Sequence, residues 1–200
     1  MLNGFSLTEL WDYEFTGFFD GVPEKNFEKH TSFDLLTSIG NSQTAVDWTS
    51  SSRIDKAFGK SWSLRYLMYL LGQIHQPMHN IIRFSAAHPD GDNFGKLHKI
   101  KSPSYNNLFE LFDDAFGQYP KLDYPLSSTT QLDDYVSKII TAFPKSQYTK
   151  EISNIDKSSW SKDSYNIGKT FAYTLSEGAD VTRKLCKIYT IQYCPKNSTI

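Results

Sequence analysis

The chain has 200 residues, of which 39% are hydrophobic, 22% charged and 15% aromatic, and its formal net charge is −1. That length suits one domain that buries about two-thirds of the surface of its unfolded chain. The composition is that of a globular rather than a disordered protein. Because no stretch concentrates Lys and Arg, the sequence excludes a basic surface for duplex DNA.

The amino-terminal stretch "MLNGFSLTELWDYEF" lacks the basic start and apolar run of a secretory signal. No run of about 18 apolar residues predicts a membrane span. We expect a monomer, and the sequence does not indicate a compartment. The two cysteines, Cys186 and Cys194, either close a small disulfide loop or stay reduced, and their spacing favours neither state.

Apolar residues at three- and four-residue steps predict four helices, over residues 60–76, 105–118, 130–143 and 161–176. Strand-like alternation is scarce, so the expected fold class is all-α, in a single helical domain. The stripes expected to pack together are Leu64, Leu67, Met68, Leu71 and Ile74 in the first helix; Leu108, Leu111, Phe112, Ala115 and Phe116 in the second; Leu132, Tyr135, Val136, Ile139, Ile140 and Phe143 in the third; and Tyr165, Ala172 and Leu175 in the fourth.

The stretch "LMYLLGQIHQPMHN" looks like a metal-site motif, because His75 and His79 are four residues apart. On a continuous helix they would share one face and could hold zinc. Pro77 lies between them, biases Gln76 away from helical angles and breaks that register. We therefore interpret His75 as a hydrogen-bonded residue at a helix end and His79 as a loop histidine.

The loop "DGDNFGKLHKIK" resembles a calcium-binding EF-hand loop at Asp90, Asp92 and Gly95. Phe94 and Lys101 occupy its fifth and twelfth positions, where oxygen ligands belong. The loop is therefore predicted to be a turn rather than a calcium site.

Asp113 and Asp114 could be a pair of catalytic carboxylates. Adjacent residues on a helix point about 100° apart, however, so they would not act on one group. We expect Asp114 to lie on a solvated helix face.

Three segments, "LRYLMYLLGQIHQPMHN", "HPDGDNFGKLHKI" and "NNLFELFDD", together resemble the zinc-dependent single-strand-specific class I nucleases, the family that also contains the 3′-nucleotidases of protists. "LWDYEFTGFFDG" and "WSKDSY" are similar to its W-H-Y and W-x-x-E-S-Y segments, so the resemblance spans about residues 11–175. It implies a helical fold of the zinc nuclease and phospholipase C type and an endonuclease with three zinc ions in a cleft. Members of the family are secreted or lysosomal.

The resemblance implies that His79 and Asp113 are retained zinc ligands, and Asp12 stands where the family has the His of W-H-Y. The family's His, Asp and His ligands are replaced by Tyr69, Gln73 and Phe109. Its G-G-N loop reads Phe94, Gly95 and Lys96 here.

We expect one nuclease-like domain over residues 1–200 that lacks the family's amino-terminal segment and its ligands. Residues 179–200 are expected to form a divergent tail.

The remaining donors predict weak or absent zinc binding, because a catalytic zinc needs about three protein ligands and an open water position. One site keeps His79 and Asp113 but has the phenyl ring of Phe109 at its third corner. A second keeps only Asp12, beside Tyr69, whose ordinary pKa of about 10 leaves the phenol protonated at neutral pH. We therefore assign no catalytic residue.

Two hypotheses remain. In the first, the chain is a non-catalytic nuclease homologue, either a truncated gene product or a module that binds single-stranded nucleic acid or nucleotides in an aromatic cleft. In the second, it is a working metal-dependent nuclease or 3′-nucleotidase with a reduced site around His79, Asp113 and Asp12, helped by His75 or His98. The zinc content of the purified protein distinguishes the two.

Overall fold

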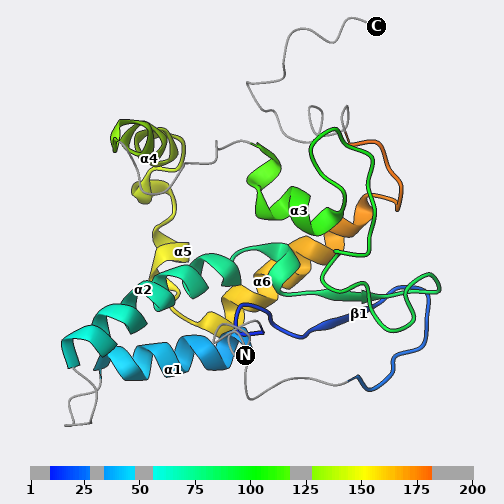
Figure 1. Ribbon diagram of the computed structural model, residues 1–200, viewed down its shortest axis with the longest axis horizontal. Coiled ribbons are helices and arrows are strands. Elements are labelled where there is room, and N and C mark those ends of the chain that lie inside the picture. Colours follow the sequence, from blue (N-terminus) through cyan, green and yellow to red (C-terminus); the bar gives the residue numbers. More distant parts are fainter. Residues whose placement is uncertain (1–9, 28–33, 48–55, 118–127, 182–200) are drawn as a thin grey trace, which may run out of the picture.

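The computed structural model describes residues 10–27, 34–47, 56–117 and 128–181 (Figure 1). The fold is helical, as predicted. Its α-helices are α1 (Leu35–Asp47), α2 (Lys56–Ile74), α3 (Leu108–Asp113), α4 (Thr130–Ala142), α5 (Thr149–Ser153) and α6 (Lys157–Thr170). Two strands that the sequence did not predict, β1 (Gly17–Phe19) and β2 (Ile82–Phe84), pair in parallel. In the described ranges, no helix is both long and apolar enough to cross a membrane.

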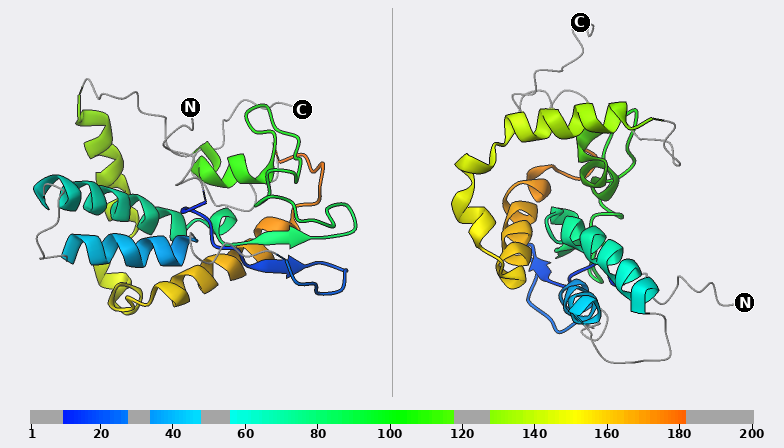
Figure 2. Two further views of the ribbon diagram at one scale, coloured as in Figure 1. Left: turned by 60° about the horizontal axis from the view of Figure 1, so that its bottom comes forward. Right: turned by 90° about the vertical axis from the view of Figure 1, so that its left-hand side faces the viewer.

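Helices α2, α3 and α6 meet at the short 3-10 turn Pro77–His79, which follows α2. Helix α1 packs along α2, while α3 and α6 both contact the turn (Figures 1 and 2). The turn therefore lies at the junction of these three helices.

The end of α2 confirms the prediction made from Pro77. The helix ends at Ile74, and Gln76 is extended, with φ −89° and ψ 119°. The Gln76 side chain accepts a hydrogen bond from the His79 backbone N–H at 3.1 Å. The buried Asn80 amide donates to the carbonyls of Ile74 and Gln76 at 3.0 and 2.9 Å. These bonds satisfy the carbonyls at the buried helix end and fix the backbone that presents His79.

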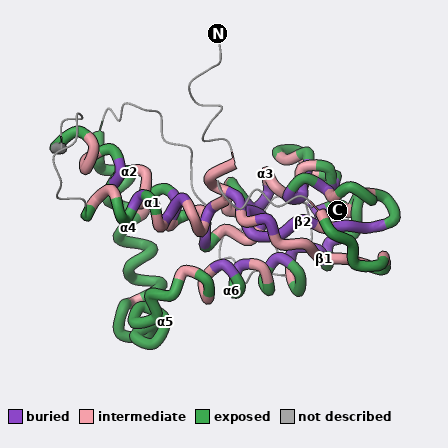
Figure 3. Tube along the Cα trace, turned by 90° about the horizontal axis from the view of Figure 1, so that it is seen from below, coloured by how far each residue is buried: buried purple, intermediate pink, exposed green. Residues whose placement is uncertain are grey.

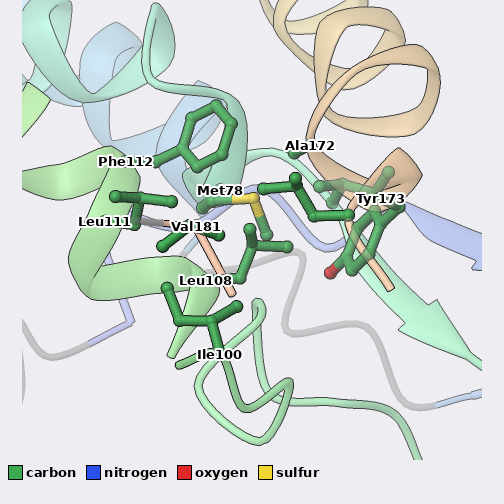
Figure 4. Packing of buried hydrophobic residues seen from close by; sticks show 10 residues of the cluster. Met78, Ile100, Leu108, Leu111, Phe112, Ala172, Tyr173 and Val181 are labelled. Atoms are coloured by element: carbon green, nitrogen blue, oxygen red, sulfur yellow. The ribbon is translucent and has the colours of Figure 1, made fainter. Parts of the chain in front are cut away.

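Helix α3 is shorter than the predicted span 105–118, because Ala115 and Phe116 adopt positive φ angles of 44° and 62° that end the helix. Asn107 caps its start, accepting a hydrogen bond from the Glu110 N–H at 2.9 Å. The predicted stripe is confirmed at Leu108, Leu111 and Phe112, which are buried. With Met78, Ala172 and Tyr173, among others, they form one hydrophobic cluster (Figure 4).

The predicted core face of α2 is partly wrong. Leu64 and Met68 are 48% and 66% exposed, whereas Ser63, Leu70 and Ile74 are buried. Ser63 is small enough to allow close approach of a neighbouring helix. A prediction from hydrophobicity alone therefore placed Leu64 and Met68 in the core and missed Ser63.

Helix α1 was not predicted, and serine is again the reason. Its buried residues, Leu35, Ser38, Ile39 and Ser42, have helical spacing, but two of the four are polar. A signal did exist, because the Asp34 carboxylate accepts a hydrogen bond from the Thr37 N–H at 2.8 Å, as expected of an N-cap.

Helix α4 forms nearly as predicted over 130–143, but the packing predicted for it is wrong. Apart from the half-buried Tyr135, its apolar side chains are exposed, from 38% at Leu132 to 62% at Ile140. In Figure 1 and in the right-hand view of Figure 2, α4 lies apart from α1 and α2. Almost all residues of α4 and α5 are exposed (Figure 3). The periodicity of the stripe predicted the helix correctly, but it could not specify a partner for that stripe.

Helix α6 contains the "WSKDSY" segment and contacts the end of α2. It starts earlier than predicted, at Lys157, and ends at Thr170, before the turn Ala172–Thr174. The Ser164 hydroxyl donates to the Ile74 carbonyl at 2.7 Å, and the Tyr165 hydroxyl donates to the Gly17 carbonyl at 3.3 Å. These bonds hold α6 against the end of α2 and against β1. The two cysteines lie outside the described residues.

Candidate functional site

His79 lies at the centre of the site and is 2% exposed. Its Nδ1 atom donates to the backbone carbonyl of Asp12 at 2.7 Å, and its Nε2 atom faces Asp113 Oδ1 at 3.4 Å. The Tyr13 ring stacks on the imidazole, with centroids 4.7 Å apart and planes at 6°, and the Phe109 ring lies 5.2 Å away. Contacts on both nitrogens and on the ring therefore fix its orientation.

His79 and Asp113, the two ligands that the resemblance implies are retained in one site, lie side by side. Their 3.4 Å separation equals the edge of a tetrahedron with metal–ligand bonds of about 2.1 Å, so the pair could fill two corners of a zinc site. The hydrogen bond to His79 lowers the pKa of Asp113 most, against the opposing effect of burial, with smaller contributions from Gln76 and Lys96. Asp113 is therefore held as a carboxylate.

This lowered pKa makes the contribution of Asp113 to stability dependent on pH. Since the folded pKa lies below the unfolded one, the contribution should be complete above about pH 4 and lost as pH falls through the lower folded value. Asp113→Asn should therefore lower the midpoint of thermal unfolding at pH 7 and change it little near pH 2. Asp134→Asn, on the exposed side of α4, is the control. An equal deficit of Asp113→Asn at both pH values would contradict the assignment.

Tyr69 and Asp12 form a second pair. The Tyr69 hydroxyl donates to Asp12 Oδ2 at 2.9 Å. Burial, followed by the charge of Asp12, raises the pKa of Tyr69 well above its ordinary value, so the phenol stays protonated. The Tyr69 hydroxyl thus occupies Asp12 Oδ2, an oxygen that a metal ion bound to Asp12 would require. Tyr69 is nevertheless 46% exposed, so its ring lies at the surface while its hydroxyl is bonded.

Asp12 and Asp113 lie at opposite edges of the His79 ring. Asp12 Oδ2 is 3.9 Å from Nδ1, whereas Asp113 is near Nε2. The two ring nitrogens point away from each other, so these three side chains do not converge on one ion. Across the ranges that the structure describes, no group of three or more His, Cys, Asp or Glu side chains is arranged to hold a metal. Gln73 is half-buried on α2, and it is Gln76 whose amide contacts Asp113, at 3.5 Å.

Lys96 adds a positive charge to the site. The sequence predicted only that this residue departs from the family's G-G-N loop, and not that its side chain would reach the site. Its ammonium donates to the Tyr13 hydroxyl at 2.9 Å. It also lies 4.8 and 4.7 Å from the ring centroids of Tyr13 and Phe109, within the range of cation–π attraction. A cation therefore lies beside the Phe109 ring.

The loop that presents Lys96 forms turns, as predicted. Both oxygens of the fully buried Asp92 accept hydrogen bonds, from the Arg83 N–H at 3.0 Å and from the Tyr173 hydroxyl at 2.6 Å. The next turn requires glycine at Gly95, where φ is 81° and a Cβ atom would lie 2.6 Å from the Met78 side chain.

The histidines suggested as helpers make other contacts. The His75 ring lies 5.2 Å from that of Trp160, and burial lowers its pKa. The buried His98 accepts from Arg83 Nη1 at 3.2 Å, and burial followed by the Arg83 charge lowers its pKa. None of these contacts involves His79.

Asp114 is half-buried and not on the solvated face expected for it. Its carboxylate accepts a hydrogen bond from the Tyr105 hydroxyl at 2.8 Å, and burial followed by this bond raises the pKa of Tyr105 to about 12. The neighbouring Asp113 faces His79. The two carboxylates thus have different partners, as the helical geometry predicted.

The donor set does not fit a catalytic zinc ion. The site with His79 and Asp113 has a phenyl ring and a lysine ammonium beside it, neither of which donates a lone pair at neutral pH. The site with Asp12 has a protonated phenol bonded to its carboxylate.

Comparison with known proteins agrees with this architecture. The family model described as S1/P1 nuclease matches residues 15–196, a span that includes both His79 and Asp113. No curated protein matches the chain. The match covers most of the sequence, and the fold around it is helical. The chain belongs to the S1/P1 nuclease family.

Proposed function

We propose that this chain is a nuclease homologue in which phosphodiester hydrolysis is impaired, because side chains have replaced most of the zinc ligands. One observation supports this most directly: the Tyr69 hydroxyl bonds to Asp12, so two positions that correspond to ligands satisfy each other at 2.9 Å. The family implies nucleic acid as the ligand.

The impairment follows from the chemistry that zinc supplies in such sites. Metal ions generate hydroxide at neutral pH and stabilise the attacking and leaving oxygens of the displacement. Here, His79 is oriented by the Asp12 carbonyl, and Lys96 provides a positive charge beside it. These groups can attract a phosphate, but they do not lower the pKa of a water molecule as zinc does. Binding is therefore supported better than turnover.

The alternative is an active metal-dependent endonuclease or 3′-nucleotidase with a reduced site. The His79–Asp113 pair favours it, since 3.4 Å suits two corners of a zinc tetrahedron. The site still lacks a third donor from Phe109, whose ring lies against His79.

The test is turnover of single-stranded DNA, RNA and 3′-nucleotides by the purified chain, with and without added zinc. We expect no cleavage above the background of a His79→Ala variant, and a zinc content near zero. Robust zinc-dependent cleavage that His79→Ala abolishes would establish the alternative instead.

A further inference from the structure

The outer face of α2 presents a row of stacked aromatic rings. Trp62 and Tyr66 have ring centroids 5.1 Å apart with planes at 19°, and Tyr66 and Tyr69 follow at 5.9 Å and 27°. Trp11 meets Tyr66 edge-on at 5.7 Å. We call Trp62, Tyr66 and Tyr69 the aromatic row.

The two end rings of this row lie outside the core, whereas Tyr66 between them is partly buried against the cluster formed by α1 and α2. Trp62 and Tyr69 are 47% and 46% exposed, whereas Leu70 and Ile74, on another face of the same helix, are fully buried. Steps of four and three residues advance about 6 and 4.5 Å along a helix axis, so the rings follow one another along one face. The helix therefore uses one face for packing and leaves rings exposed on another.

The aromatic row is continuous with the site around His79. Tyr69, its last ring, is the residue whose hydroxyl bonds to Asp12, and the backbone carbonyl of Asp12 accepts from His79. Arg65 is exposed, three residues after Trp62 and four before Tyr69, and so lies on the same face. A ligand on the row would thus meet flat rings, a guanidinium and then the former metal site.

We propose that the aromatic row and Arg65 bind single-stranded nucleic acid by base stacking, without hydrolysis. The inference rests on the nucleic-acid ligand named in the proposed function, but it assigns binding to a face outside the ligand positions. Every base offers a flat face to an aromatic ring, so such binding tolerates sequence, and duplex DNA hides those faces. Arg65 supplies a phosphate contact that the net charge of −1 does not.

The exposed apolar side chains of α4 differ from the aromatic row in their chemistry. The exposed apolar side chains of α4 are mainly aliphatic, among them Leu132, Val136, Ile139 and Ile140, and these offer no flat face for stacking. The row on α2 combines rings with a cation, which is the combination that single strands require.

Fluorescence anisotropy of a labelled oligothymidylate, titrated with the full chain in EDTA, measures binding free of any turnover. We expect Trp62→Ala to weaken binding about 10-fold, and Trp62→Phe to restore most of it. Arg65→Gln should weaken binding and reduce its dependence on salt by about one phosphate contact. The matched controls are Phe143→Ala, at a side chain 58% exposed directly after α4, and Lys138→Gln, on α4. Both should bind as the unmodified chain does.

Circular dichroism and thermal unfolding verify that each variant is folded, which the exposure of Trp62 leads us to expect. The inference is overturned if the unmodified chain does not bind the oligothymidylate, or if it binds duplex DNA as tightly as the single strand. It is also overturned if the folded Trp62→Ala and Arg65→Gln variants bind the single strand as tightly as the unmodified chain does. Zinc-dependent cleavage would refute the proposed impairment alone, so the two proposals fail separately.

Discussion

Phe109→Gln should leave zinc binding weak, whereas Phe109→His should lower the zinc dissociation constant about 100-fold relative to the unmodified chain. Positions 109 and 113 are one helical turn apart on α3, so the new imidazole and Asp113 would share a face beside His79. A full structural set of four ligands contributes about 10–16 kcal/mol, or roughly 3 kcal/mol for each ligand. That amount corresponds to at least about 100-fold in affinity.

Lys96 should limit this gain. Its ammonium lies 4.7 Å from the centroid of the ring that is replaced, and a dication nearby would be repelled by about 2 kcal/mol or more. Adding Lys96→Gln to Phe109→His should therefore tighten zinc binding a further tenfold or more, whereas Lys99→Gln, at an exposed lysine of the same loop, should not.

Competition with a chromophoric chelator measures all of these dissociation constants. Equal affinity of the unmodified chain and the double variant would show that the positions of Phe109 and Lys96 do not adjoin a metal site. Nuclease activity should require more changes, including Tyr69→His and Gln73→Asp, because the site with Asp12 would still lack its donors.

Asp92→Ala should lower the free energy of unfolding by about 3 kcal/mol. The carboxylate is fully buried, and it accepts hydrogen bonds from the Arg83 backbone N–H and from the Tyr173 hydroxyl. Removing it leaves both buried donors without their acceptor and opens a small cavity. Because Asp92 joins the loop that contains Lys96 to β2 and to the turn Ala172–Thr174, the loss should affect the whole domain.

Asp90→Ala provides the matched control two residues away. Its carboxylate is 96% exposed and pairs with Lys25 at 3.3 Å, so the substitution should change stability little. Urea unfolding followed by circular dichroism gives both values. A loss at Asp92 no larger than that at Asp90 would mean that the two buried hydrogen bonds do not stabilise the fold.

The sequence predicted those features that depend on local rules. Pro77 fixed the end of α2 because the residue before proline avoids helical angles, and Gln76 does so. The family resemblance placed His79 beside Asp113, although they are 34 residues apart, and the two meet at 3.4 Å. The stripe of α3 was also correct, since its large apolar residues point to one cluster.

The features that were missed depend on partners that lie far apart in sequence. The cation–π contacts of Lys96 require Tyr13, 83 positions away, and no local pattern connects the two residues. The core face of α2 depends on serines of α1, which a hydrophobic scale ranks as surface residues. For the same reason, the periodicity of α4 predicted a helix but not whether anything would cover it.

The bond between Tyr69 and Asp12 also bears on how the protein reaches its native state. Where metal ions hold segments together, folding requires metal, and chelators unfold the protein. In this chain, a phenol joins α2 to the segment before β1, and the Asp12 carbonyl holds His79, so ordinary side chains make the connections. We therefore expect folding of this centre not to require zinc, so that EDTA should leave the midpoint of thermal unfolding unchanged.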